Sequence, residues 1–195
     1  MTRPNTREKI VGAADLLFYE QGFENTSFAE VAKEVGISRG NFYHHFKTKD
    51  QILEAVIERR LQERQAMLDR WEIDGETPQQ RIASFIRLLL LNETKIRAYG
   101  CPVGTLFLEL SKVNHDHQAD ALRLFDLFRY WLRRQFLRMG LADDADDLAM
   151  TLLARSQGVA TLASAYPNED FLEREVARMM AWLDAIASNQ QTSIK

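Results

Sequence analysis

The residues best suited to chemistry lie in one short segment, residues 36–47, which reads GISRGNFYHHFK. It contains two adjacent histidines, His44 and His45, and imidazole rings commonly bind metals or act as general bases. Neighbouring positions on a helix point about 100° apart, so these two rings cannot chelate one ion together. No carboxylate follows either histidine by three or four residues to orient its ring for acid/base catalysis. The pattern therefore indicates neither a metal centre nor a catalytic pair, and no cofactor is expected.

The same segment fits a helix with a buried back and a polar front. Phe42 and Phe46 fall about 40° apart on a helix, so they mark one buried face. Ser38 can cap the start of this helix, and Gly36 allows a tight turn before it. Two short helices joined by a glycine turn make a helix-turn-helix, whose second helix enters the DNA major groove.

Amino-acid composition and helix capping signals predict an all-α protein. The 195 residues are 46% apolar and 27% charged, with only four prolines and nine glycines, and such a chain favours helix nearly throughout. Capping signals and glycine stops set the expected boundaries. The predicted helices cover residues 6–21, 28–35, 39–46, 49–71, 78–98, 103–112, 116–139, 143–165 and 169–187.

An acidic stretch broken by a glycine, residues 72–77 (EIDGET), is the predicted domain boundary. It divides a helix-turn-helix domain over residues 1–50, with a linking helix over 48–71, from a helical domain over 72–195.

Several classes of protein are excluded by simple counts. No apolar stretch approaches the roughly 18 residues that a membrane span needs, and the first residues contain no signal-peptide core. The single cysteine, Cys101, rules out an intramolecular disulfide and fits a reducing compartment. We therefore expect a cytoplasmic protein that does not enter a membrane. The tripeptide His115-Asp116-His117 resembles a metal-binding motif, but it is expected to form the solvated start of a helix.

The spacing of residues 22–53 resembles the N-terminal domain of the TetR family of bacterial transcriptional repressors. The resemblance covers about residues 6–57, with phenylalanine at position 42 where the family more often has leucine. The matching positions are Gly22, Thr26, Ser27, Ala32, Gly36, Ile37, Ser38, Tyr43, His45, Phe46 and Lys49.

The resemblance implies a DNA-binding role for particular residues. By this resemblance, four residues contact DNA phosphates: Thr26, Ser27, Tyr43 and Lys49. By the same resemblance, five residues face the DNA bases or the adjacent DNA backbone: Ser38, Arg39, Gly40, Asn41 and His44. Residues 1–50 contain as many acidic as basic residues, so Arg39, Lys47 and Lys49 must gather on one face.

A single three-helix module covers little DNA, so we expect a homodimer on a pseudo-palindromic operator. The resemblance also implies a dimer built from two helices of each subunit. The expected interface residues are Ala154, Gly158, Thr161, Ala165, Val176, Met179, Met180 and Leu183. The alternative is that these stripes complete the core within one chain.

A regulator of this kind also needs an effector site, because a ligand must favour the state that does not bind DNA. The central helices are rich in apolar and aromatic residues, which suit a small apolar or aromatic molecule. The candidate contacts are Phe85, Leu89, Cys101, Leu108, Phe125, Phe128 and Trp131, with Arg155 and Gln157 as polar partners. Each apolar member is also well suited to plain core.

The main hypothesis is thus a ligand-responsive, homodimeric repressor without catalytic activity. One alternative is a repressor that senses oxidants or electrophiles through Cys101, and another is a helical DNA-binding protein without an effector. An enzyme would need a third catalytic group beside Cys101 or His115 and His117, and none is near in the sequence.

Overall fold

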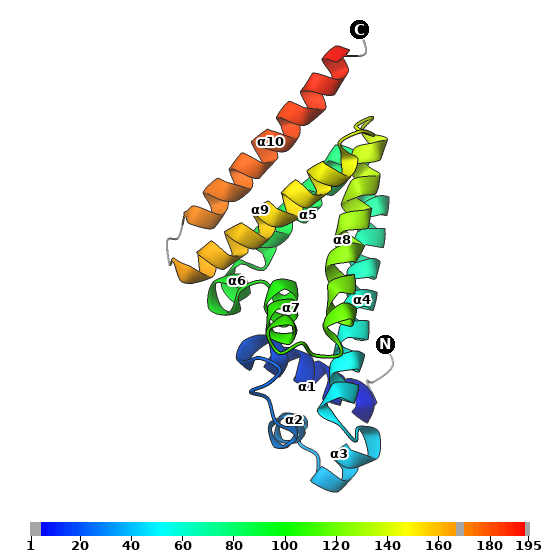
Figure 1. Ribbon diagram of the computed structural model, residues 1–195, viewed down its shortest axis with the longest axis vertical. Helices are drawn as coiled ribbons and strands as arrows, with labels where there is room; N and C mark the ends of the chain where they lie inside the picture. Colours follow the sequence, from blue (N-terminus) through cyan, green and yellow to red (C-terminus); the bar gives the residue numbers. More distant parts are fainter. Residues whose placement is uncertain (1–4, 167–169, 194–195) are drawn as a thin grey trace. The chain divides into compact units, whose positions relative to one another are not determined.

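A computed structural model describes residues 5–166 and 170–193 of the chain, and within these ranges it contains helices and no strand. The all-α prediction is therefore confirmed. The helices, labelled in Figure 1, are α1 (Thr6–Gln21), α2 (Phe28–Val35), α3 (Arg39–His45), α4 (Lys49–Asp74), α5 (Pro78–Leu91), α6 (Glu93–Tyr99), α7 (Pro102–Lys112), α8 (Gln118–Arg138), α9 (Ala145–Ala165) and α10 (Phe171–Ser193).

Local caps account for several of the helix boundaries. Asn5, Ser27 and Thr77 each accept a hydrogen bond from the backbone three residues later and complete a capping box. Such a box pairs two backbone donors that a helix would otherwise leave unpaired. Gly36 ends α2 in the left-handed conformation, with φ at 72°, where a side chain would be strained.

The prediction of one helix over residues 78–98 is wrong, because Asn92 separates α5 from α6. Its backbone leaves the helical region, and its side-chain amide donates to the Leu88 carbonyl at 2.9 Å. Asparagine offers the backbone such alternative hydrogen bonds, which interrupts a helix that the apolar pattern alone would continue.

The helices form two compact units. The first unit contains Met1–Glu63 and Pro102–Leu124, and the second contains Arg64–Cys101 and Phe125–Lys195. Residues 102–124 therefore pack with the helix-turn-helix region, although they follow the boundary expected at residues 72–77.

The first unit has its own apolar core. Helix α1 packs against α2 and α7, and α2 packs against α3 (Figure 1). The α7 residues Leu106 and Leu110 lie in the same buried cluster as Phe18, Phe23 and Phe42. Helix α7 is thus part of the body that holds the helix-turn-helix.

The second unit is built on contacts between α5, α6, α9 and α10. Helix α10 contacts α5 and α9, while α6 also packs on α9. At the end of α4, the Glu72 carboxylate accepts hydrogen bonds from Gln135 and Arg138 of α8, both at 2.6 Å. The helix ends of this unit are therefore joined by polar contacts as well as by apolar packing.

Candidate nucleic-acid interface

Helix α3 is anchored from behind by two phenyl rings, as its spacing predicts. Phe42 is 1% exposed and Phe46 is 2% exposed, and both belong to the core of the first unit. Phe28 of α2 packs on Phe42 with ring centroids 5.2 Å apart. Ser38 accepts the Asn41 N–H at 3.3 Å and caps the helix. The expected burial of the two phenylalanines is confirmed.

The other side of this helix is polar and exposed. We define the α3 surface as the exposed residues of α3 and its two ends: Ser38, Arg39, Gly40, Asn41, Tyr43, His44 and Lys47. The Tyr43 ring packs edge-on against Phe28, with centroids 5.6 Å apart. The Lys47 ammonium donates to the Tyr43 carbonyl. The α3 surface thus combines two cationic groups with hydroxyl, amide and imidazole groups, which are the donors and acceptors that contact phosphates and base edges.

Thr26 does not fit the phosphate-binding role that the resemblance implies. Its side chain is buried, with the residue 2% exposed, and its hydroxyl donates to the Gly22 carbonyl at 2.7 Å. Thr26 therefore fixes the turn between α1 and α2. Ser27 is exposed, but its hydroxyl is used in the capping box with Glu30.

Lys49 is also drawn into the protein. Its ammonium donates to the carbonyls of Phe23 and Glu24 at 3.0 and 3.2 Å, and it lies 4.3 Å from the centre of the Phe23 ring. Two of the three donors of this group therefore bind the turn, and the phosphate contact of Lys49 stays a prediction. The group on the other side of the turn is Glu109, which accepts the N–H groups of Phe23 and Glu24 and which no sequence pattern indicated.

The histidines are paired with carboxylates or with each other. His45 is half-buried, and its ring contacts His44 with centroids 5.4 Å apart. His115 lies 3.4 Å from the Asp50 carboxylate, and His117 lies 2.9 Å from that of Asp120. Among the residues that the structure describes, no group of three or more possible metal ligands comes together.

The candidate effector residues fall into different environments. Phe85, Leu89 and Phe128 are buried in the second unit, and the rings of Phe85 and Phe128 lie 5.5 Å apart. Trp131 is 1% exposed and packs on Trp71 at 5.5 Å. Its indole N–H is buried and has no hydrogen-bond partner within the described part of the chain.

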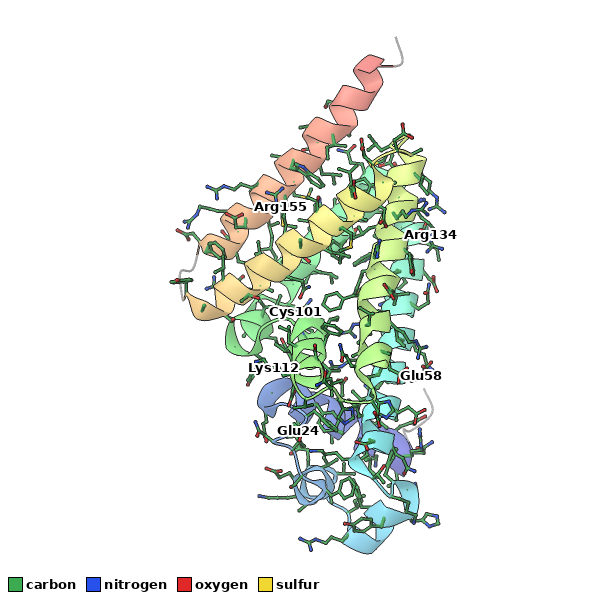
Figure 2. All side chains as sticks on the ribbon, in the orientation of Figure 1. Glu24, Glu58, Cys101, Lys112, Arg134 and Arg155 are labelled. Atoms are coloured by element: carbon green, nitrogen blue, oxygen red, sulfur yellow. The ribbon has the colours of Figure 1, made fainter. Side chains whose placement is uncertain are left out.

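Other members of the effector set lie at or near the surface. Leu108 is 57% exposed and belongs to the first unit, so it is removed from the buried apolar set. Its outward position on α7 follows from Leu106 and Leu110, which take the buried face. The half-buried members of the set are Cys101, Phe125, Arg155 and Gln157. The Arg155 guanidinium lies 5.7 Å from the Trp182 ring. Cys101 immediately precedes α7, and both Cys101 and Arg155 are labelled in Figure 2.

The two stripes expected at the dimer interface also differ. The α9 residues Ala154, Gly158, Thr161 and Ala165 are exposed. On α10, by contrast, Val176, Met179 and Leu183 are buried within the chain and Met180 is half-buried. Val176, Met179 and Leu183 complete the core of the chain, so their assignment to the interface is corrected, while that of Met180 stays a prediction.

Both parts of the chain match described sequence families. Residues 10–56 match the bacterial regulatory proteins of the tetR family. Residues 78–179 match the C-terminal domain of LmrA/YxaF-like transcriptional regulators. The chain belongs to the TetR family.

Individual relatives of this TetR family member support the assignment over part of their length. An uncharacterized HTH-type transcriptional regulator of Lactococcus lactis is 30% identical over 62% of this chain and 63% of its own length. The HTH-type transcriptional regulator LmrA of Bacillus subtilis is 35% identical over 57% of this chain and 60% of its own. The matches thus span less than two thirds of either relative.

Solved structures share the fold. A TetR transcriptional regulator from Legionella pneumophila has a TM-score of 0.83 and 23% identity, covering 95% of this chain and 99% of its own. The reduced form of Escherichia coli NemR has a TM-score of 0.76 and 21% identity, covering 89% and 94% of the two chains.

Residues 5–166 and 170–193 contain no helix with the length and apolar character of a membrane span.

Proposed function

We propose that this TetR family member is a cytoplasmic transcriptional repressor that binds a pseudo-palindromic operator as a homodimer and has no catalytic activity. The observation that carries the proposal is the α3 surface, which is polar and exposed while Phe42 and Phe46 bury the opposite side of the helix. A short helix held in this way suits insertion into the major groove.

The α3 surface supplies groups for two kinds of contact. Arg39 and Lys47 are exposed cations, which suit phosphates, while Asn41 and His44 carry groups that can pair with base edges. Ser27 and Tyr43 remain proposed phosphate contacts at the edge of this surface. Thr26 instead supports the turn beneath it, while Lys49 binds that turn and stays a proposed phosphate contact through its third N–H.

The proposed effector site lies among the buried aromatic residues of the second unit. Phe85, Leu89, Phe128 and Trp131 are candidates for its apolar wall. A buried donor without a partner costs about 1–3 kcal/mol, so an effector with an acceptor for the Trp131 N–H would gain from satisfying it. We infer a small apolar or aromatic effector that carries a carbonyl, hydroxyl or ether oxygen.

The test begins with selection of bound DNA from a random library by the wild-type protein. Affinity for the selected DNA is then measured against salt concentration. Lys47→Ala should flatten the logarithmic salt dependence by about one unit, because one phosphate contact is lost. Asn41→Ala should instead change the preferred bases, with a cost of about 1–3 kcal/mol on the best site.

A matched control is Lys95→Ala, which removes the same charge from an exposed position on α6. Its salt dependence should equal that of the wild type. Equal slopes for Lys47→Ala and Lys95→Ala, together with an unaltered preference in Asn41→Ala, would contradict the assignment of the α3 surface.

A further inference from the structure

The turn between α1 and α2, residues 22–25, is held through the backbone N–H and C=O groups of Phe23 and Glu24. The Glu109 carboxylate accepts the Phe23 N–H at 2.9 Å through one oxygen and the Glu24 N–H at 2.8 Å through the other. The Lys49 ammonium donates to the carbonyls of the same two residues, at 3.0 and 3.2 Å. Figure 2 labels Glu24 in this turn. Four charge-assisted hydrogen bonds therefore fix two residues, and bonds of this kind are the stronger ones in proteins.

Gly22 makes the close approach of Glu109 possible. Its φ of 91° favours glycine, and a β-carbon there would lie 3.0–3.4 Å from the carboxylate of Glu109. Thr26 closes the other side of the turn through its bond to the Gly22 carbonyl. The turn is thus shaped to receive a carboxylate from α7.

Helix α7 is itself firmly held in the first unit. Leu106 and Leu110 lie in the apolar core. The buried Arg60 guanidinium donates to the Pro102 carbonyl at 2.7 Å and to the Asp15 carboxylate at 2.6 Å, which joins the first residue of α7 to α4 and α1. Glu109 therefore joins the turn to a helix that is itself fixed within the same unit.

The turn leads into α2 and, through it, into α3. Ser27 caps α2 two residues after the turn, and Phe28 in the first turn of α2 packs on Phe42 of α3. Fixing residues 22–25 therefore limits the positions that α2 and α3 can take. A binding surface that is fixed beforehand loses less conformational freedom on association.

We propose that Glu109 is a positioning residue for DNA recognition, which ties α7 to the turn at residues 22–25 and so holds α2 and α3 in the DNA-binding arrangement. The inference rests on the proposed DNA-binding function. Along the chain, α7 directly follows α6 and Cys101 of the second unit.

The experiment uses the full chain and DNA selected by the wild type. Glu109→Gln keeps the size of the side chain but removes its charge, and we expect about tenfold weaker DNA binding, which corresponds to about 1.4 kcal/mol. The salt dependence should not change, because no phosphate contact is lost. Amide hydrogen exchange at Phe23 and Glu24, followed residue by residue, should become about tenfold faster or more.

Two further variants sharpen the test. Glu54→Gln removes the same charge from an exposed position on α4 and should leave both readouts unchanged. Lys49→Met releases the turn from its other side, so it should also weaken DNA binding and speed amide exchange at Phe23 and Glu24. Unchanged exchange in Lys49→Met would contradict a turn that is held from both sides.

The outcomes distinguish the positioning role of Glu109 from the proposed DNA-binding function. Faster amide exchange in folded Glu109→Gln with DNA affinity within twofold of the wild type would overturn the positioning role while leaving the proposed function intact. Unchanged exchange at Phe23 and Glu24 would also overturn it. Failure of the wild type to select any DNA sequence would overturn the proposed function, and the inference with it.

Discussion

Gly40 is a residue at which helix stability and DNA recognition oppose each other. It lies exposed in α3, and a β-carbon built there would meet nothing within 4 Å. Packing inside the chain therefore does not require a glycine at this position. A glycine in a helix costs about 0.5–1 kcal/mol relative to alanine, and close approach of a base or phosphate would account for that cost.

Gly40→Ala is accordingly expected to raise the free energy of unfolding by about 0.5–1 kcal/mol. It should at the same time weaken DNA binding by about tenfold, because the added methyl group occupies the space of the duplex. Urea unfolding and titration with the selected DNA measure the two effects. Gly36→Ala is the contrasting variant, since its φ of 72° makes any side chain unfavourable and should lower stability.

If Gly40→Ala is more stable and still binds DNA with wild-type affinity, the backbone at residue 40 does not approach the duplex. The base-contact assignment of that position would then be withdrawn.

Residue roles could be predicted only where they follow from the local pattern. The burial of Phe42 and Phe46 follows from helical spacing alone. The inward use of Thr26 and Lys49 does not, because it depends on how the turn at residues 22–25 is folded. Glu109 lies 86 residues from Phe23 along the chain, and nothing in the sequence connects the two.

At the scale of elements, Glu72 links three helices. Its carboxylate accepts hydrogen bonds from Gln135 and Arg138 of α8, and it lies 3.2 Å from the guanidinium of Arg81 on α5. Partial burial acts to raise the pKa of Glu72, but the hydrogen bonds from Arg138 and Gln135 hold it below its ordinary value. The ionised form is therefore favoured in the folded protein.

Glu72→Gln should lower the free energy of unfolding at neutral pH by about 1 kcal/mol, after allowance for solvent screening. A folded pKa below the ordinary 4.5 stabilises the fold fully above that pH. The contribution is lost as the pH falls through the lower, folded pKa. The stability difference between wild type and variant, measured by chemical unfolding from pH 7 down to pH 3, should therefore shrink in acid.

Glu76→Gln serves as the control, because Glu76 is exposed in the same connection between α4 and α5. A constant gap between wild type and Glu72→Gln across this pH range would show that the carboxylate charge does not stabilise the helix ends.

Helix boundaries were more predictable than helix partners. Capping boxes are local, so the starts of α1, α2 and α5 could be placed from the sequence. The break at Asn92 was missed because LLLLN reads as a continuing apolar face. The partners of α7 were missed for a different reason: its apolar stripe shows that one face is buried but not which helices cover it.

At the scale of the whole molecule, α9 presents a face that residues 5–166 and 170–193 leave exposed. Ala154, Gly158, Thr161 and Ala165 are exposed, and so are Leu162 and Tyr166. A β-carbon at Gly158 would meet nothing within 4 Å. Small residues in an uncovered stripe allow two helices to approach closely, as a symmetric dimer requires.

Gly158→Leu should therefore disrupt a dimer while leaving the fold of each chain intact. Sedimentation equilibrium should show a shift from dimer to monomer, and circular dichroism should show unchanged helix content. Ala29→Leu, an exposed change on α2, should leave the mass unchanged. A Gly158→Leu protein that remains dimeric at micromolar concentration would place the interface elsewhere.

The all-α fold class was predictable because helix-favouring composition and capping signals are present along the whole sequence. The division into units was not, since it depends on contacts between distant segments. Stripes on α9 and α10 look alike in sequence, yet only the α9 stripe is exposed, because α10 turns its larger apolar residues toward α5 and α9.

The first unit is formed by two separate segments of the chain, which limits where the protein can be divided into folded fragments. A fragment ending at residue 72 would lack Leu106, Leu110 and Ala121 from its apolar core, as well as the carboxylate of Glu109. Chimaeric regulators spliced at that point would combine α2 and α3 with the α7 of another protein, and the contacts of Glu109 with the turn would be lost. Exchange of sensory parts between such proteins should therefore carry residues 102–124 along with the DNA-reading end.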